Sequence, residues 1–86
     1  MKIEILKFEA DWCGPCQKLK PVWVEAQKNY LSYKFTVVDC TDDLAQARKY
    51  NVKSVPTFIV LEDGKEVDRV VGANPQGFYD ALNRWL

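Results

Sequence analysis

The sequence predicts an α/β fold, in which three helices cover both faces of a four-stranded mixed sheet in the order βαβαββα. Three observations lead to this prediction. Short apolar runs alternate with segments of helical periodicity, and an Asp-Gly pair separates the last two apolar runs. The strand–helix–strand order at the start also requires a parallel, right-handed crossover. With 86 residues, the chain has room for one domain, which we expect to span residues 1–86.

The first strand and the first helix occupy the N-terminal third of the chain. Residues 3–8 (IEILKF) are mostly apolar and rich in strand formers, which is typical of a central strand. Residues 15–30 have helical spacing, since one face carries Leu19, Val22, Trp23, Ala26 and Tyr30. Pro15 suits the first turn, where its missing N–H is not needed. Pro21 lies inside the helix and cannot bond the carbonyl of Gln17, so we expect a kink there.

A second strand and a short helix come next. Residues 35–40 (FTVVDC) are rich in strand formers. We expect Thr41 to cap a helix that ends near Tyr50. Acidic residues fall in its first turn and basic residues in its last, where both complement the helix dipole. They are Asp42, Asp43, Arg48 and Lys49.

The C-terminal part predicts a hairpin and a closing helix. Residues 57–61 (TFIVL) are uniformly apolar, which indicates a strand buried on both faces. The pair Asp63-Gly64 predicts a tight turn into residues 66–71 (EVDRVV), whose mixed polarity indicates an edge strand. Asn74 followed by Pro75 marks the start of the last helix. Its apolar face carries Phe78, Ala81, Leu82 and Trp85.

The charge balance argues against two classes of partner. The chain has 12 basic and 12 acidic residues, so it lacks the basic surplus typical of proteins that bind nucleic acid or a membrane surface. Its apolar stretches are much shorter than the ~20 residues needed to span a bilayer. Charges at Lys2, Glu4 and Lys7 interrupt the early apolar run, so no signal-peptide pattern is present. We therefore expect a cytoplasmic protein.

The run Trp12-Cys13-Gly14-Pro15-Cys16 carries the chemistry. Its two cysteines are spaced so that their sulfurs can close a small disulfide ring and open it again. Cys13 precedes the first helix, whose N-terminus stabilises a thiolate, so we expect it to attack disulfides and to be the more exposed of the pair. Cys16, one turn inside, can resolve the resulting mixed disulfide. The alternatives are a structural disulfide or two buried thiols.

The remaining cysteine and the absence of histidine bear on metal binding. The chain has three Cys and no His, fewer than the four ligands of a structural zinc site. A zinc or iron–sulfur site shared between two chains is the one metal site that stays open, and we expect no metal.

We interpret Cys40 as a small buried apolar residue, with a regulatory thiol as the alternative.

Together these residues resemble the thioredoxin family over nearly the whole chain. The resemblance rests on the Trp-Cys-Gly-Pro-Cys run, Pro21 in the following helix, Val55-Pro56-Thr57 opening a strand, the Asp-Gly hairpin, and Gly72. It implies a thioredoxin-like fold and exchange of dithiol for disulfide with disulfide-containing proteins. It also implies a thioredoxin-reductase-type electron donor. The redox group is the Cys13/Cys16 pair itself, so no bound cofactor is expected, and we expect a monomer.

The chain departs from the family pattern in three ways. The usual N-terminal strand and helix are missing, so we expect four strands and not five. Lys7 stands where thioredoxins usually carry a buried acid, and Glu9 where they usually carry an aromatic residue. The shortened core also resembles glutaredoxins, which leaves a glutathione-linked enzyme as one alternative. A binding subunit of a larger complex is the other.

The resemblance also implies roles for residues around the cysteines. Gly14 and Pro15 set the turn between the sulfurs. Trp12 is either a flat platform for substrate or part of the core. Pro56 would follow a cis peptide bond that turns the Val55 backbone towards the sulfurs, where it can pair with an extended substrate segment. Gly72 allows another backbone to approach. The plain alternatives are a strand-start proline and a strand-end glycine.

Lys7 is the sharpest departure from the family. It shares a strand face with Glu9 because side chains alternate along a strand. A buried, unpaired ammonium is very costly. We therefore expect Lys7 to reach solvent, to pair with Glu9 or to lose its proton. In the simplest case its stem packs against the core and its head extends to water.

Overall fold

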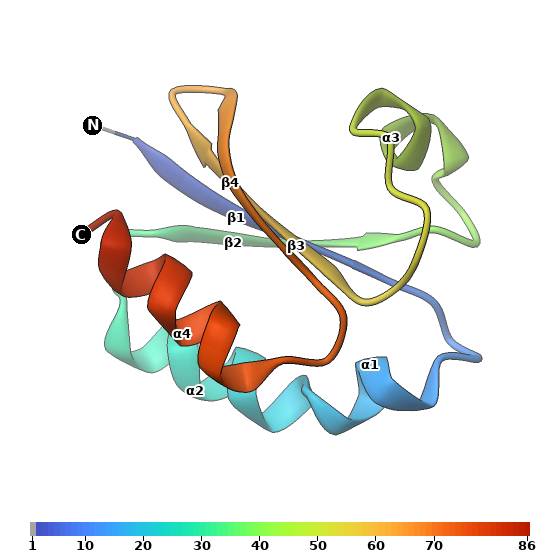
Figure 1. The fold of residues 1–86 in the computed structure, drawn as a ribbon, viewed down its shortest axis with the longest axis horizontal. Coiled ribbons are helices and arrows are strands. Elements are labelled where there is room, and N and C mark those ends of the chain that lie inside the picture. The colour runs from blue at the N-terminus through green and yellow to red at the C-terminus, as the bar shows by residue number, and fades with distance from the viewer. Residues whose placement is uncertain (1) are drawn as a thin grey trace.

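The computed structural model describes residues 2–86 and places a four-stranded sheet between helices on both of its faces (Figure 1). Its strands lie in the order β2-β1-β3-β4. Their bounds are β1 Ile3–Glu9, β2 Lys34–Asp39, β3 Thr57–Glu62 and β4 Lys65–Val71. β1 pairs with β2 in parallel, and β3 is antiparallel to both β1 and β4. The predicted fold class is confirmed, with β1 central, β4 at an edge and β3 buried on both faces.

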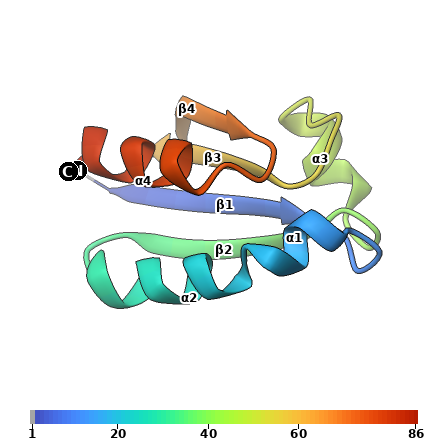
Figure 2. The same cartoon turned by 60° about the horizontal axis from the view of Figure 1, so that its bottom comes forward.

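The predicted first helix is kinked as expected, and it forms two segments. α1 covers Gly14–Lys18 and α2 covers Lys20–Asn29. They meet at Leu19, whose amide bonds the carbonyl of Cys16 in a tightened turn. The cause is Pro21, which has no N–H and whose ring crowds the preceding turn. Figure 2 shows α2 continuing from α1 beneath β2.

The cap of the third helix differs from the prediction. α3 covers Leu44–Lys49, and its N-cap is Asp43 instead of Thr41. The Asp43 carboxylate accepts the N–H of Gln46 at 3.1 Å. Residues 40–42 form a turn instead, in which the carboxylate of Asp39 accepts the N–H of Thr41 at 2.8 Å. The basic last turn and the end at Tyr50 are as predicted, but the prediction of Asp42 and Asp43 in the first turn is wrong, because both precede the helix that begins at Leu44.

The hairpin and the last helix follow the prediction. Asp63 and Gly64 have φ angles of 50° and 87°, a left-handed pair typical of a two-residue turn between antiparallel strands. The side chain of Asn74 accepts the N–H of Gly77 at 3.0 Å and so caps α4, which covers Pro75–Arg84.

The sheet buries a different apolar core on each face. α2 and α4 cover one face, and α3 lies on the other side near the end of β2 (Figure 1). The larger core packs around Trp23, whose ring lies against Phe35, Phe58 and Phe78. The smaller core lies under α3 and comprises Leu6, Phe8, Val38, Ile59 and Leu61. β1 contributes to both cores, and its C-terminal end leads directly to the cysteines.

Candidate active site

The first cysteine caps the helix that carries the second. The carbonyl of Ala10, just beyond β1, accepts the N–H of Cys13 at 3.0 Å and closes a tight turn. Cys13 is the N-cap of α1, and its sulfur accepts the backbone N–H of Cys16 at 3.1 Å. Gly14 and Pro15 occupy the first helical positions, so the helix begins one residue before the predicted start at Pro15. Negative charge on the Cys13 sulfur would therefore meet a helix N-terminus and a hydrogen-bond donor.

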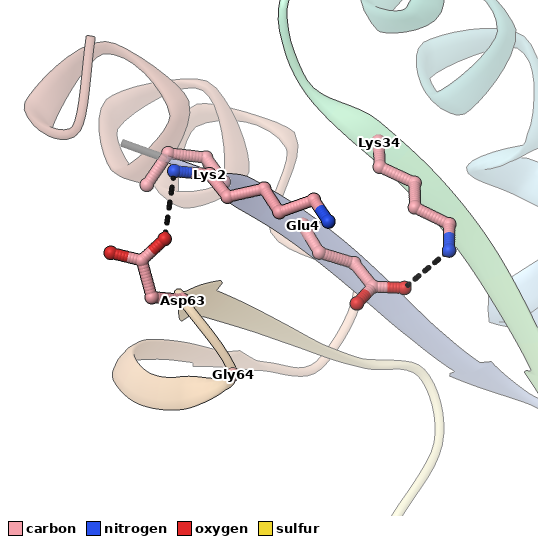
Figure 3. Close-up of a pocket in the computed structure, with 6 residues that line it drawn as sticks. Lys2, Glu4, Lys34, Asp63 and Gly64 are labelled. Carbon is pink, nitrogen blue, oxygen red and sulfur yellow. Dashed lines mark hydrogen bonds and ion pairs between the residues drawn. The ribbon is translucent and has the colours of Figure 1, made fainter.

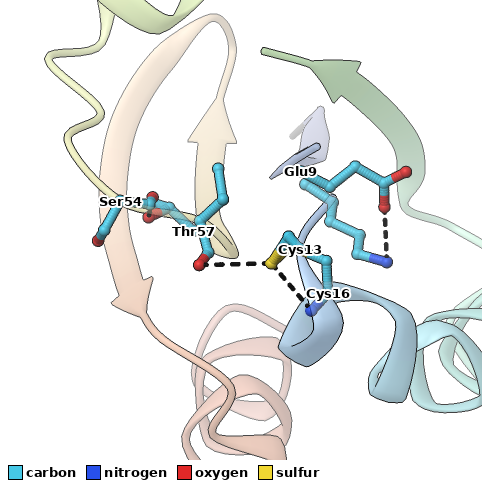
Figure 4. Close-up of a disulfide and its surroundings, with 7 residues drawn as sticks. Glu9, Cys13, Cys16, Ser54 and Thr57 are labelled. Carbon is cyan, nitrogen blue, oxygen red and sulfur yellow. Dashed lines mark hydrogen bonds and ion pairs between the residues drawn. A yellow bond between two sulfur atoms is a disulfide. The ribbon is translucent and has the colours of Figure 1, made fainter. Parts of the chain in front are cut away.

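The two sulfurs form a disulfide (Figure 4), and the two side chains differ in exposure. Their Cα atoms are 5.3 Å apart. Cys13 is 4% exposed and Cys16 is fully buried at 0%, which confirms the expected order. Cys16 packs in a small apolar cluster with Ala10 and Cys13, against the partly buried Val55. A partner can therefore approach Cys13 more readily than Cys16.

The segment before β3 reaches the same point from the other side. The Val55–Pro56 peptide bond is cis, as the resemblance implied. The carbonyl oxygen of Val55 lies 3.7 Å from the Cys13 sulfur. The carbonyl of Pro56 accepts the N–H of Gly72, whose φ of 95° favours glycine. The structure thus brings Val55, Pro56 and Gly72 together beside the cysteines.

An apolar hollow of about 200 Å³ reaches the cysteines through Val55, which lines it and whose carbonyl oxygen lies 3.7 Å from the Cys13 sulfur. Trp12 forms one wall and is 77% exposed, so the interpretation of Trp12 as a core residue is wrong. The hollow is lined by Trp12, Cys40, Leu44, Ala47, Val52, Lys53, Ser54 and Val55. Sequence reasoning missed Leu44, which is 57% exposed at the start of α3. An apolar side chain directly after a helix cap was the available signal.

Lys7 does not extend to water. Its side chain is 1% exposed, so the prediction that its head reaches solvent is wrong, and the predicted pairing with Glu9 is confirmed. The ammonium lies 2.9 Å from the Glu9 carboxylate, which keeps 14% of its own side chain exposed. It also lies 5.8 Å from the centre of the Trp23 ring. A buried ion pair therefore lies between β1 and α2, at the end of the sheet where the cysteines are.

The third cysteine is partly buried beside the hollow. Cys40 packs against the smaller core and is a free thiol. Burial and the neighbouring carboxylates of Asp39 and Asp43 raise the pKa of its thiol. These surroundings keep Cys40 protonated and less nucleophilic at neutral pH.

A second hollow, of about 430 Å³, lies at the opposite end of β1 (Figure 3). Lys2, Lys34, Glu4 and Asp63 line it, so its charges balance. Lys34 and Glu4 are 3.9 Å apart there. Within residues 2–86, no group of three Cys, Asp or Glu side chains is placed to hold a metal ion. In the same range, none of the helices has the length and apolar character to cross a bilayer.

Comparison with known proteins agrees with this geometry. Residues 1–84 match the family model described as Thioredoxin. A thioredoxin H-type from Oryza sativa subsp. indica is 44% identical over 81 residues, which are 94% of this chain and 66% of that protein. One from Populus jackii is 43% identical over 74 residues, which are 85% of this chain and 52% of that protein. The chain thus spans between half and two thirds of the length of these curated relatives.

Solved structures show the same relationship. A poplar thioredoxin h superposes with a TM-score of 0.93 and 36% identity, covering 98% of this chain and 76% of the other. The thioredoxin NaTrxh from Nicotiana alata gives a TM-score of 0.94 and 34% identity, covering 96% of this chain and 72% of the other. The fold, the disulfide and these matches agree, and the chain belongs to the thioredoxin family.

Proposed function

We propose that this protein is a thiol–disulfide oxidoreductase that reduces disulfides in other proteins through Cys13 and Cys16. The observation that carries the proposal is the capping geometry. The Cys13 sulfur caps the N-terminus of α1 and accepts the Cys16 N–H at 3.1 Å. An apolar hollow is lined by Trp12, the residue before Cys13, and by Val55, whose carbonyl oxygen lies 3.7 Å from the same sulfur. A thiolate held in this way is a nucleophile, and the hollow gives an extended polypeptide somewhere to lie.

The reaction takes two steps. The Cys13 thiolate attacks a sulfur of the substrate disulfide, a mixed disulfide forms, and the other substrate sulfur leaves and takes a proton. Cys16 then attacks the Cys13 sulfur, which releases the second substrate thiol and closes the Cys13–Cys16 disulfide. Two electrons pass from the dithiol to the substrate. The protein's own sulfurs carry them, so the reaction proceeds without a bound cofactor.

The residues around the cysteines support binding of substrate. Trp12 offers an exposed aromatic surface on one side of the hollow. On the other side, the carbonyl of Val55 faces the Cys13 sulfur and is available to an extended segment, with Pro56 and Gly72 shaping the backbone around it. We expect a cytoplasmic monomer whose Cys13–Cys16 disulfide is reduced again by a thioredoxin-reductase-type electron donor. The family match favours this function over a glutathione-linked enzyme or a binding subunit.

Turnover with a protein disulfide such as insulin tests the proposal. The reduced protein should reduce insulin catalytically when a thioredoxin reductase and its electron donor are supplied, and Cys13→Ser should abolish the reaction. Glutathione alone should support little turnover. Efficient turnover with glutathione would favour the glutaredoxin-like alternative, and an inactive wild-type protein would contradict the proposed activity.

A further inference from the structure

The structure buries one charged side chain next to the proposed active site. Within residues 2–86, Lys7 and Thr57 are the polar side chains that are buried. The Thr57 hydroxyl donates to the carbonyl of Ser54 and carries no charge. Lys7 pairs in the sheet with Val37 and Phe58 on its neighbouring strands, so apolar residues flank it on both sides. The anion that stabilises its ammonium is Glu9.

The Lys7 ammonium lies towards the cysteine end of β1. Its side chain extends forward along the strand to Glu9, the residue before Ala10, and Ala10 packs against Cys13 and Cys16. From the helix side, Cys16 is the buried residue of α1, and Trp23 is a buried residue of α2, the helix that continues from it. The ammonium lies 5.8 Å from this ring. Figure 4 draws the Glu9 ion pair together with the disulfide.

Of the two cysteines, Cys16 is the one whose thiolate depends on a nearby positive charge. It is 0% exposed, and burial disfavours a thiolate because the charged form loses its hydration. The Cys13 sulfur has the helix N-terminus to stabilise its charge, whereas Cys16 lies one turn inside. A fixed positive charge nearby offsets part of this cost.

The other ionisable groups around the pair are at the surface or neutral. On β2, Asp39 lies opposite Glu9 and is partly exposed, and the N–H of Cys40 donates to the Glu9 carbonyl. Asp11 in the loop before Cys13 is exposed, as are Lys18 on α1 and Lys20 on α2. β3 contributes Phe58 and Thr57, whose side chains carry no ionisable group. Water screens the exposed charges, so Lys7 and Glu9 dominate the field inside the protein.

We propose that Lys7, held in place by Glu9, favours the thiolate form of Cys16 and so promotes the second step of disulfide exchange. This inference rests on the proposed function. In that step the Cys16 sulfur attacks Cys13, the bond between Cys13 and the substrate breaks, and the departing substrate sulfur takes the proton that Cys16 lost. Lys7 and Glu9 are positioning residues, since they act on Cys16 through their charges.

The test isolates Cys16 and changes each charge separately. In a Cys13→Ser/Cys40→Ala background, Cys16 is the remaining thiol of the three, and its ultraviolet thiolate absorbance is titrated against pH. Lys7→Met removes the cation and leaves the Glu9 anion, so the midpoint should rise by about one pH unit, a tenfold loss of thiolate at a given pH. Glu9→Gln removes the anion and leaves the cation, so the midpoint should fall.

The opposite signs distinguish an electrostatic role from a structural one. Both substitutions break the same pair, so damage to the local packing would move the midpoint in the same direction in both. The double variant Lys7→Met/Glu9→Gln carries neither charge, and its midpoint should lie between those of the single variants. Lys34→Met, which breaks the exposed pair with Glu4 at the far end of β1, is the matched control and should leave the midpoint unchanged.

Shifts of the same sign, or unchanged midpoints in folded single variants, would overturn the inference. Circular dichroism of each variant establishes that it is folded. If one single variant is not folded, the sign of the shift of the other single variant relative to the double variant is the test. The titration does not depend on substrate turnover. If the wild-type protein fails to reduce insulin while the midpoints shift as expected, the proposed function fails and the charge effect stands.

Discussion

Removing one charge of the Lys7–Glu9 pair should destabilise the fold strongly. Removing the other charge as well should restore most of the lost stability. Glu9→Gln leaves the ammonium of Lys7, 1% exposed, without its carboxylate. Removing one partner of a buried ion pair costs about 3–5 kcal/mol. Because Glu9 keeps 14% of its side chain exposed, we expect the lower end, about 3 kcal/mol.

This loss is large for so small a protein. At about 0.05–0.15 kcal/mol per residue, a chain of 86 residues has a total stability of about 4–13 kcal/mol. Each kcal/mol shifts the melting temperature of such a domain by about 4–8 °C. Glu9→Gln should therefore lower the melting temperature by roughly 12–24 °C.

Urea unfolding, followed by tryptophan fluorescence, measures the effect as a double-mutant cycle. Lys7→Met keeps an apolar side chain near Trp23 but leaves the Glu9 carboxylate without its cation. It should therefore also destabilise the protein. The double variant should lose less free energy of unfolding than the two single variants lose together, since it buries two neutral side chains and no unpaired charge. Lys34→Met breaks a pair that is 72% and 30% exposed and should cost about 0–1 kcal/mol. Additive losses, or single-variant losses as small as that of the control, would show that the Lys7–Glu9 pair does not stabilise the fold in this way.

Three further predictions follow from other parts of the structure. Trp12→Ala should leave the free energy of unfolding within about 0.5 kcal/mol, because the ring is 77% exposed. It should lower kcat/KM about fivefold or more for a protein disulfide, while a small disulfide reagent reacts normally. Cys40→Ala should keep turnover within about twofold and cost about 1 kcal/mol of stability, and a large loss of activity would indicate a functional thiol. For Asp68, burial raises the pKa, but hydrogen bonds from Trp85, the Arg69 amide and Arg84 outweigh it and hold the pKa below its ordinary value of 3.8. The carboxylate therefore adds stability above that pH and loses it as the pH falls further. Asp68→Asn should cost about 1–3 kcal/mol at neutral pH, with a difference that shrinks in acid, and a constant difference in urea unfolding across this range would contradict the assignment.

The strand pattern and the turns could be predicted from the sequence because their signals are local. The uniform apolar run of β3, the Asp63-Gly64 turn and the Asn74 cap each specify one structure. The start of α3 is different. Thr41, Asp42 and Asp43 can all cap a helix, and the choice depends on Asp39 using its carboxylate to hold the preceding turn.

Side-chain environments near the cysteines depended on distant parts of the chain. Whether Lys7 reaches water depends on Trp23 of α2, whose ring lies 5.8 Å from the ammonium, and on Phe58, its paired residue on β3. The hollow beside Cys13 joins Trp12 to Leu44 and Val55 across three separate segments. The cysteine pair needed no such information, because two residues separate Cys13 from Cys16 and the following helix orients both.

The division of roles between Cys13 and Cys16 is tested most directly by trapping the mixed disulfide. Reduced Cys16→Ser protein is incubated with a disulfide-containing protein substrate, and the products are digested without reductant and identified by mass spectrometry. We expect a stable adduct on Cys13, which dithiothreitol releases, and none on Cys40. Cys13→Ser should accumulate no adduct, because Cys16 is fully buried. Adducts that accumulate on Cys16 in the Cys13→Ser protein, with none on Cys13 in the Cys16→Ser protein, would mean that Cys16 attacks the substrate and Cys13 resolves the mixed disulfide.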